Sequence, residues 1–484
     1  MCPTVRASRC LAPLQRAPIS AENDREKSGK LHPLPACLPM SWRAAPSTCG
    51  RPGRGIARYH GRHAPPPAMI EMDQTTERAL RLYAFGDVML HGRYQAHADA
   101  GTAADLFAPL SALLADADLA VGNLETPLTT AGTARADKLC LRGDPVYARH
   151  LAEAGVSVLS LANNHCMDFG ADALAETRAL LDAAGIASTG AGADLASATA
   201  PVIVERHGIR VGLLAACDAL TKPAPAATAT TPGIAPLEPE AVLAAVDALR
   251  PQVDHLVLML HWGLEYSPLP TPEQVQLADA AIARGVSVIL GHHSHCMQGV
   301  MQRGGAVVAY SLANLTDDGV DLKTPMRHYL APLTEVDRES FLLRLALHKD
   351  RVELLEPVPL WLDDSGRPTA ATGERAEKIR AQLADCTAQL AATADLETHW
   401  ADSVIERRVA GPLISWWRDG SLWDKMRRFR PGQLVSAWLL LTTYLKVRFS
   451  RGDDRWLLYN ERNDTRPMPA VRQPRSGSDN GGTE

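Results

Sequence analysis

Short apolar stretches alternate with stretches of helical spacing through the middle of the chain. The apolar stretches are residues 80–90, 118–125, 156–165, 209–218, 254–263, 286–295 and 306–315. The stretches with apolar side chains three and four positions apart are residues 104–117, 144–155, 172–185 and 272–285. Near-continuous apolar strands between amphipathic helices predict an α/β fold whose sheet is covered on both faces.

This alternation ends near residue 369. Before that point, residues 341–348 and 351–362 predict a hairpin that turns at Lys349–Asp350. Beyond it, helical spacing returns at 374–392 and 400–418 without intervening strands. We therefore predict a C-terminal extension built from helices.

The first 77 residues differ from the rest, being rich in Pro, Arg, Gly and Ser without a sustained period. Such a composition is typical of disorder, because it buries too little apolar area to offset the entropy of ordering. The predicted organisation is a disordered extension over 1–77, an α/β domain over 78–369 and a helical accessory segment over 370–484.

Composition narrows the classes of partner. The formal net charge of −5 over 484 residues gives no electrostatic indication of nucleic-acid binding. Nine cysteines are scattered without a CxxC pair, which favours a reducing compartment over a disulfide framework.

No apolar run reaches the roughly 18 residues that a membrane-spanning helix requires. The longest run is 434–445, which basic residues flank on both sides. We interpret it first as a buried helix and second as a weak peripheral membrane contact through 427–448. No signal peptide is apparent, so we expect the protein in the cytoplasm or at the inner face of the membrane.

Polar residues that can bind metals follow the end of one predicted strand after another. Three histidines occupy four positions in "GHHSH", and comparable groups follow four other strands. The residues are Asp87 and His91; Asn123 and Glu125; Asn163, Asn164, His165 and Asp168; His261 and Glu265; and His292, His293 and His295. Because ligands bind outside the carboxyl ends of strands in α/β sheets, we expect these five groups to converge.

The converging side chains have a definite chemistry. Six of them are suitable ligands: the carboxylates Asp87 and Glu125, the amide of Asn164, and the imidazoles His261, His293 and His295. Mixed nitrogen and oxygen ligands suit manganese, iron or zinc, and six ligands fit a two-metal centre with one bridging carboxylate. His165, beside Asn164, is then the natural proton donor to a leaving group. Taken singly, each of these residues is as well explained by a satisfied polar group or a turn.

Seven segments together resemble the CapA family of capsule or poly-γ-glutamate synthesis proteins. They are "GDVMLHGR" (86–93), "GNLETPLT" (122–129), "SLANNHCMDFG" (160–170), "GAGADLASATAP" (190–201), "LHWGLEYSPLPTPEQVQLA" (260–278), "GHHSHCMQ" (291–298) and "YSLANL" (310–315). The resemblance implies the fold of the calcineurin-type metallophosphoesterases, a layered α/β/β/α sandwich, here with a C-terminal helical extension.

The resemblance also implies roles for single residues. The six ligands named above take the metal positions, for one or two divalent ions, and His165 takes the catalytic position with Asp168 orienting it or shaping its loop. The other residues expected to line the site are His91, Arg93, Asn123, Asn163, Glu265, His292 and Asn314. Metallophosphoesterases usually carry a histidine two residues after the first aspartate, where this chain has Met89. We therefore expect one metal position to be weak or empty.

Three functions are compatible with these residues. The first is a polymer-synthesis protein whose metal site hydrolyses a phosphate ester. The second is a scaffold that binds an anionic polymer or a partner enzyme without turnover, and the third is a metal-dependent amide hydrolase acting on a γ-glutamyl chain. The expected partners are a phosphate-containing substrate or an anionic polymer, together with other polymer-synthesis proteins.

Overall fold

A computed structural model describes residues 78–218, 224–324, 327–331 and 333–392 of the chain. Three predictions lie outside these residues: the disorder of 1–77, the helix at 400–418 and the membrane contact through 427–448. Within the described residues, no helix is long and apolar enough to cross a membrane.

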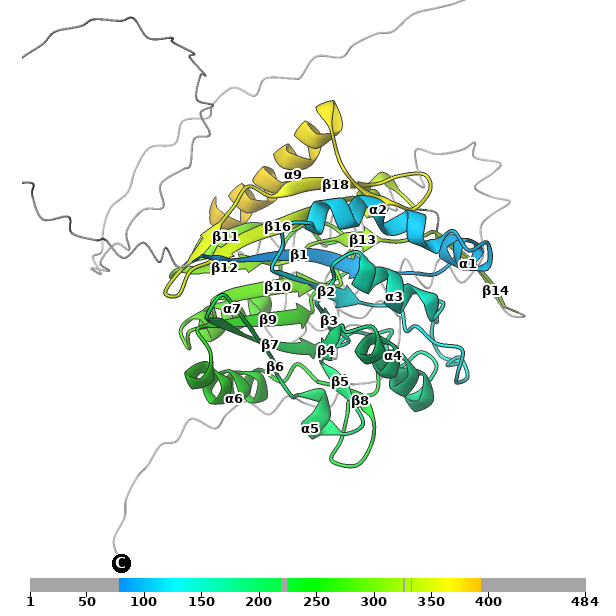
Figure 1. Ribbon diagram of the computed structural model, residues 1–484, viewed down its shortest axis with the longest axis horizontal. Helices are drawn as coiled ribbons and strands as arrows, with labels where there is room; N and C mark the ends of the chain where they lie inside the picture. The colour runs from blue at the N-terminus through cyan, green and yellow to red at the C-terminus, as the bar shows by residue number, and fades with distance from the viewer. Residues whose placement is uncertain (1–77, 219–223, 325–326, 332, 393–484) are drawn as a thin grey trace, which may run out of the picture. The chain divides into compact units, whose positions relative to one another are not determined.

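The first sheet has strand order β19-β18-β16-β1-β2-β3-β4, with β13 beside β1 and β17 beside β16 (Figure 1). Its strands are β1 (Leu80–Val88), β2 (Leu119–Leu124), β3 (Val158–Ser160), β4 (Ala187–Thr189), β13 (Asn314–Thr316), β16 (Glu339–Leu347), β17 (Val352–Leu354), β18 (Val358–Leu362) and β19 (Pro368–Ala370). Strands β1 to β4 run parallel, and β16 pairs antiparallel with β1. The predicted hairpin is confirmed, since β16 pairs antiparallel with both β17 and β18.

The second sheet has strand order β11-β12-β10-β9-β7-β6. Its strands are β6 (Val202–Arg206), β7 (Ile209–Cys217), β9 (His255–His261), β10 (Val288–His292), β11 (Val300–Arg303) and β12 (Ala306–Ala309). The four central strands are parallel, so β9 and β10 present their carboxyl ends at one edge. Two small ribbons complete the strands, β5 (Ala191–Gly192) with β8 (Gly233–Ile234), and β14 (Val320–Thr324) with β15 (Arg327–Ala331).

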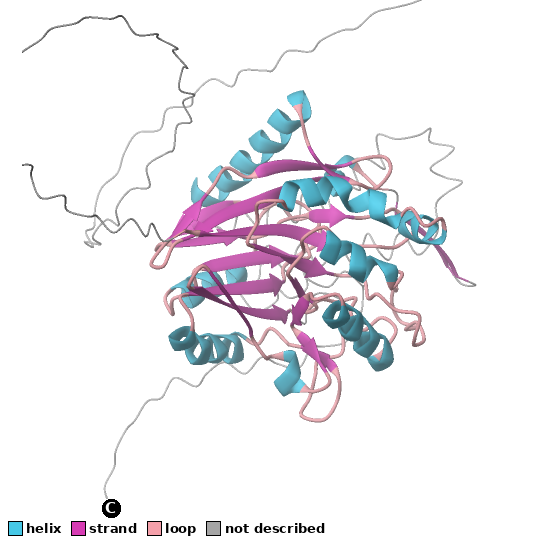
Figure 2. Cartoon of the chain, viewed as in Figure 1, coloured by secondary structure: helices cyan, strands magenta, loops and turns pink. Residues whose placement is uncertain are grey.

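The helices lie around the two sheets (Figure 2). They are α1 (Arg93–Asp99), α2 (Ala103–Leu114), α3 (Val146–Glu153), α4 (Ala171–Ala183), α5 (Leu195–Ala198), α6 (Pro239–Leu249), α7 (Pro272–Ile282), α8 (Glu335–Arg338) and α9 (Gly373–Ala392), with a 3₁₀ turn at Arg250–Gln252. The predicted helix at 272–285 is α7, and its start is fixed by a capping box. The Thr271 hydroxyl accepts from the Gln274 backbone, and the Gln274 amide accepts from the Thr271 backbone.

Alternate residues of the second sheet point to opposite layers. Leu213 and Val257 share a hydrophobic cluster with strands of the first sheet, whereas Leu214 and Leu258 pack with Val246 of α6 and with α7. Successive side chains of a strand point to opposite faces, so one face of this sheet meets the first sheet and the other meets helices. Helices α2, α3 and α4 pack with the first sheet. The predicted α/β/β/α sandwich is confirmed.

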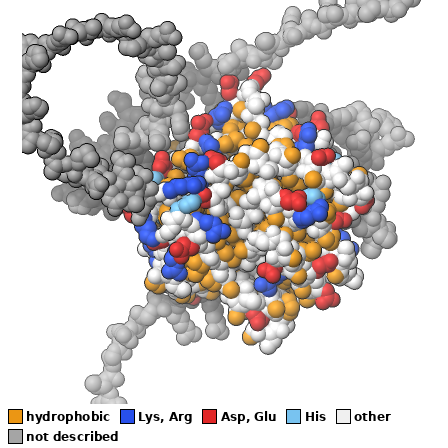
Figure 3. Space-filling model, viewed as in Figure 1, with side chains coloured by type: hydrophobic (Ala, Val, Ile, Leu, Met, Phe, Trp, Pro, Cys, Tyr) orange, Lys and Arg blue, Asp and Glu red, His pale blue; other side chains and the backbone are white. Residues whose placement is uncertain are grey.

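Helix α9, the first helix of the predicted accessory segment, packs against the sandwich. It contacts β11 and β18. The backbone N–H of Val300 donates to the Thr387 hydroxyl over 3.1 Å, and the Cys386 thiol lies 3.6 Å from the Met297 carbonyl oxygen. On the face that Figure 3 shows, acidic and basic side chains are interspersed with apolar ones.

The expected single strand at 306–315 is wrong, because these residues form two strands in different sheets. β12 ends at Ala309, and β13 begins at Asn314 in the first sheet. Between them, Ala313 has a left-handed φ of 57°, which turns the chain. Its carbonyl oxygen accepts from the Asp87 backbone at 2.8 Å. A Cβ on Gly86 would lie 1.9 Å from that oxygen, so only glycine permits this approach, which places Asn314 opposite Asp87.

Candidate metal centre

The six predicted ligands converge at the carboxyl ends of strands from both sheets. Asp87, Glu125 and Asn164 come from the β1, β2 and β3 ends of the first sheet, and His261, His293 and His295 from the β9 and β10 ends of the second. All six side chains are buried. Ligands that are far apart in sequence therefore meet where the two sheets face each other.

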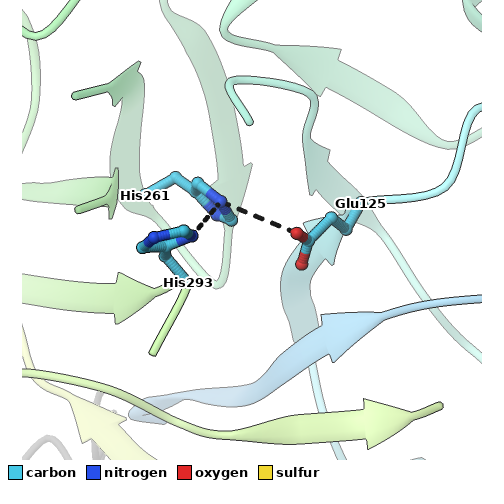
Figure 4. A group of neighbouring side chains, drawn as sticks. All are labelled: Glu125, His261 and His293. Atoms are coloured by element: carbon cyan, nitrogen blue, oxygen red, sulfur yellow. Dashed lines mark hydrogen bonds and ion pairs between the residues drawn. The ribbon is translucent and has the colours of Figure 1, made fainter. Parts of the chain in front are cut away.

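One group of donors surrounds the Nε2 atom of His261 (Figure 4). The Oδ1 atom of Asn164 lies 3.0 Å from it, the Nδ1 atom of His293 lies 3.1 Å from it, and the Oε1 atom of Glu125 lies 3.8 Å from it. Two ligand atoms on one tetrahedral zinc, each at about 2.0–2.1 Å, are about 3.3 Å apart. Burial lowers the pKa of His261, and the nearby His293 lowers it further, so its ring is neutral as a metal ligand requires.

A second group consists of Asp87, Glu125 and His295. The Asp87 carboxylate accepts from the Asn123 amide at 2.8 Å and from the His293 backbone at 3.0 Å. Its Oδ1 atom also lies 3.1 Å from the Nδ1 atom of His292. Burial alone would raise the pKa of Asp87, but the His292 contact and the neighbouring histidines hold it below its usual range. Asp87 is therefore an ionised carboxylate.

Glu125 belongs to both groups. Its side chain is fully buried, and neither carboxylate oxygen has a hydrogen-bond partner within the described residues. Burial raises the pKa of Glu125 well above its ordinary value, which His295 opposes, whereas Asp87 and Glu265 raise it further. A buried carboxylate without donors is costly unless a cation compensates it. The donor set and this carboxylate, which accepts no hydrogen bond within the described residues, fit divalent metal.

The "GHHSH" loop gives each of its histidines a different place. His292 contacts Asp87, His293 belongs to the donor group of His261, and His295 belongs to that of Asp87. His293 and His295 also fall together in a third group. His293 and His295 both have left-handed backbone conformations, with φ of 87° and 52°. Such conformations are costly for residues other than glycine and tend to occur at functional sites.

A chain of polar contacts leads outward from His295. Its Nδ1 atom lies 2.9 Å from Oδ1 of Asn314, whose amide donates weakly to Asp317 at 3.4 Å. Asp317 in turn lies 3.2 Å from Nε2 of His91. Burial opposes protonation of His295, but the charges of Glu125 and Asp87 raise its pKa to about 9. Asn314 is therefore connected to the site through His295, and His91 is connected to it through Asp317.

His165 lies beside a buried ion pair. Its Nδ1 atom is 2.6 Å from Oδ2 of Asp168, and Oδ1 of Asp168 is 2.7 Å from the Nζ atom of Lys138. Lys138 also donates to the Asn164 carbonyl oxygen at 2.5 Å. Burial, and then Lys138, lower the pKa of His165 to about 4. Near pH 7 the ring is neutral, and Asp168 favours the tautomer with the proton on Nδ1.

The remaining predicted residues differ in their relation to the centre. Asn123 holds Asp87, and the Asn163 amide oxygen caps the loop by accepting from the His165 and Cys166 backbones. Glu265 falls in a donor group with His293 and His295. Arg93 is not brought into the centre, because its guanidinium binds the Asp318 carboxylate at 2.6 and 2.8 Å.

Sequence reasoning missed Lys138 and Asp317. Lys138 lies in an irregular segment without hydrophobic periodicity, so nothing in the sequence marks it. Asp317 follows β13 directly and lies three residues after Asn314, so the same strand-end pattern that identified the ligands also applies to it.

The fold and donor set define an α/β/β/α protein with a buried carboxylate–histidine site that fits divalent metal. Residues 81–319 match the family model described as "Bacterial capsule synthesis protein PGA_cap". This match confirms the resemblance of these residues to CapA proteins.

Two relatives have CapA in their names. "PGA biosynthesis protein CapA" of Bacillus subtilis (strain 168) is 31% identical over 237 residues, which cover 48% of this chain and 62% of the relative. "Capsule biosynthesis protein CapA" of Bacillus anthracis is 28% identical over 314 residues, which cover 63% of this chain and 72% of the relative. This chain thus spans less than two thirds of the length of the first of these relatives.

A solved structure with a similar arrangement is that of a novel phosphatase from Mycoplasma pneumoniae. It is 13% identical with a TM-score of 0.39, and the match covers 59% of this chain and 95% of that chain.

Proposed function

We propose that this protein serves capsule or poly-γ-glutamate synthesis as a divalent-metal-dependent hydrolase that cleaves a phosphate ester. The observation that carries the proposal is Glu125. It belongs to two donor groups at once, and neither of its buried oxygens accepts a hydrogen bond from the part of the chain that the structure describes. That arrangement supports a two-metal site in which one carboxylate bridges.

The residues present would hold manganese, iron or zinc in two positions. Glu125, His261, His293 and Asn164 would form one, and Glu125, Asp87 and His295 the other. Two bound divalent ions neutralise charge on a phosphoryl oxygen and lower the pKa of a bound water towards neutrality.

The surrounding side chains fix these donors before any metal binds. Asn123 and the His293 backbone orient the Asp87 carboxylate, and the Asn314 amide oxygen accepts from Nδ1 of the His295 ring. Such outer contacts set ring orientation and typically change metal affinity by about 10–100-fold when lost.

His165 would handle the proton. With Nδ1 directed at Asp168, its Nε2 atom is the free position, and the lowered pKa keeps the ring neutral near pH 7. An anionic substrate group beside Nε2 would stabilise the imidazolium, which then returns the proton to a leaving oxygen. Lys138 holds Asp168 in place and opposes premature protonation of the ring.

A second candidate function is hydrolysis of a γ-glutamyl amide. The printed name of the Bacillus subtilis relative favours it, because that name refers to PGA biosynthesis. A two-metal centre polarises an amide carbonyl as well as a phosphoryl oxygen.

The test uses purified full-length protein supplied in turn with Mn²⁺, Fe²⁺ and Zn²⁺. Substrates are bis(p-nitrophenyl) phosphate, p-nitrophenyl phosphate and a γ-glutamyl p-nitroanilide. We expect phosphoester turnover in wild type, and we expect Glu125→Gln and His261→Asn to abolish it. The control is His255→Asn, which replaces a buried histidine of β9 outside both donor groups and should retain turnover. Metal-dependent turnover of the γ-glutamyl substrate alone selects the amide hydrolase. Metal binding without turnover of any substrate supports a binding scaffold and contradicts the proposal.

A further inference from the structure

We propose that Glu265 is a further metal ligand, completing the position formed by Asp87, Glu125 and His295. The inference rests on the proposed metal centre and adds a residue to it. It assigns to the β9–α7 connection a direct part in metal binding.

The two positions of the centre are unequal without Glu265. The position around His261 has four donors, because Asn164 Oδ1 lies 3.0 Å from His261 Nε2. The other position has three, from Asp87, Glu125 and His295. Met89 is buried two residues after Asp87, but its thioether is a soft ligand that suits copper(I) better than manganese or zinc. Divalent ions with nitrogen and oxygen ligands take at least four ligands, so three protein ligands leave a position for water or for a further side chain.

Glu265 is placed to supply a fourth side-chain ligand to the position of Asp87, Glu125 and His295. Its carboxylate, His293 and His295 each offer a ligand atom, and these atoms lie within 4.8 Å of one another. The buried Glu125 carboxylate, which accepts no hydrogen bond within the described residues, faces the same histidine, with Oε1 at 3.8 Å from His295 Nε2. Glu265 is only half-buried, so it lies on the more open side of the centre.

The backbone around Glu265 is bound firmly to the "GHHSH" loop. The N–H of Tyr266 donates to the Ser294 carbonyl at 2.7 Å, and the Gln298 amide donates to the Ser267 carbonyl at 2.8 Å. Tyr266 has a left-handed φ of 58°, a costly conformation for a residue with a large side chain. These contacts hold Glu265 beside the histidines instead of leaving it to a free loop.

The structure also limits what Glu265 does if it is not a ligand. A carboxylate that merely lines an entrance would leave the number of bound ions unchanged when neutralised. A ligand would not, because Glu265→Gln replaces an anionic oxygen donor by a weaker neutral one. The number and affinity of bound ions therefore separate the two roles.

The experiment is a Mn²⁺ titration of metal-free full-length protein, followed by isothermal calorimetry and by the EPR signal of free Mn²⁺. The variants are Glu265→Gln, Glu265→Asp, His261→Asn and a matched control, Glu273→Gln, which neutralises an exposed glutamate in the first turn of α7. Thermal unfolding in EDTA verifies that each variant is folded.

We expect wild type and Glu273→Gln to bind two Mn²⁺. Glu265→Gln should keep the tighter ion and bind the second about 10–100-fold more weakly. Glu265→Asp should have an intermediate affinity for the second ion. His261→Asn should lose the ion that Glu265→Gln keeps. Two ions at wild-type affinity in Glu265→Gln overturn the inference and leave the metal centre standing. Wild type that binds no Mn²⁺, Fe²⁺ or Zn²⁺ overturns the centre itself.

Discussion

Replacing Glu125 by glutamine should have opposite effects on stability with and without metal. In metal-free protein, Glu125→Gln removes a buried charge whose two oxygens have no hydrogen-bond donors within the described residues. An unsatisfied buried polar group costs about 1–3 kcal/mol, and a charged one costs more. We therefore expect the variant to be more stable than wild type in EDTA.

The expected change in Tm follows from the number of residues in the domain. For roughly 315 residues, at about 2.1 cal/mol/K per residue, each kcal/mol moves Tm by about 1.5 °C, so Glu125→Gln should gain about 2–5 °C. The folded-state pKa of Glu125 lies above its ordinary value of 4.5. The native state therefore retains this proton longer than the unfolded state, and the penalty develops as pH rises above 4.5. The gain should be larger at pH 7.5 than at pH 5.

Metal should reverse the order of stability of wild type and Glu125→Gln. An ion at 100 times its Kd adds about 2.7 kcal/mol, or about 4 °C per site at the slope above. Wild type should gain this for each position, whereas Glu125→Gln loses a ligand from both and should gain less than half as much. The assay is differential scanning calorimetry in EDTA and in Mn²⁺.

Glu339→Gln is the matched control, because Glu339 is also buried but pairs with Lys378 at 2.7 Å. It should be less stable than wild type, by a similar amount in both conditions. If Glu125→Gln behaves like Glu339→Gln, Glu125 is a structural residue and the reasoning from its unpaired oxygens is wrong.

Three further predictions test other parts of the molecule. His165→Gln should retain both metal ions but lower turnover by about 10²–10⁴-fold; unchanged turnover with metal retained excludes proton transfer by His165. Burial lowers the pKa of His255 below 6.5. The unfolded state therefore binds the proton more readily, so His255 should destabilise the fold as pH falls through 6.5. Between pH 8 and 5, Tm should fall less steeply in His255→Gln than in wild type, and equal slopes contradict this. In Gly86→Ala the new Cβ would lie 1.9 Å from the Ala313 oxygen, so the free energy of unfolding measured by chemical denaturation should fall by more than about 3 kcal/mol. Gly101→Ala has open space around it and should lose only about 1–2 kcal/mol, because of its positive φ. Similar losses in both variants contradict the close-approach argument.

The strands and the convergence of the candidate ligands were predictable because each carries a local signal. β7 and β9 are continuous apolar runs, since one face meets the other sheet and one meets helices. His261 and Glu125 were found because parallel strands place their carboxyl ends together. No long-range contact was needed for either inference.

Other features depend on contacts that the sequence does not encode locally. The division of 306–315 between two sheets rests on the left-handed Ala313 and its approach to Gly86. Lys138 reaches Asp168 across 30 positions from a segment without periodicity. The sharing of Glu125 between two groups of donors is visible only once both sheets are placed.

The central claim is that two divalent ions share Glu125. Anomalous diffraction at the manganese edge from crystals grown with Mn²⁺ tests it most directly. We predict two peaks roughly 3.5–4 Å apart, one bounded by His261, His293 and Asn164 and the other by Asp87, His295 and Glu265, with the Glu125 carboxylate between them. No peak at these side chains, or a single peak that Glu125 does not touch, would contradict the account.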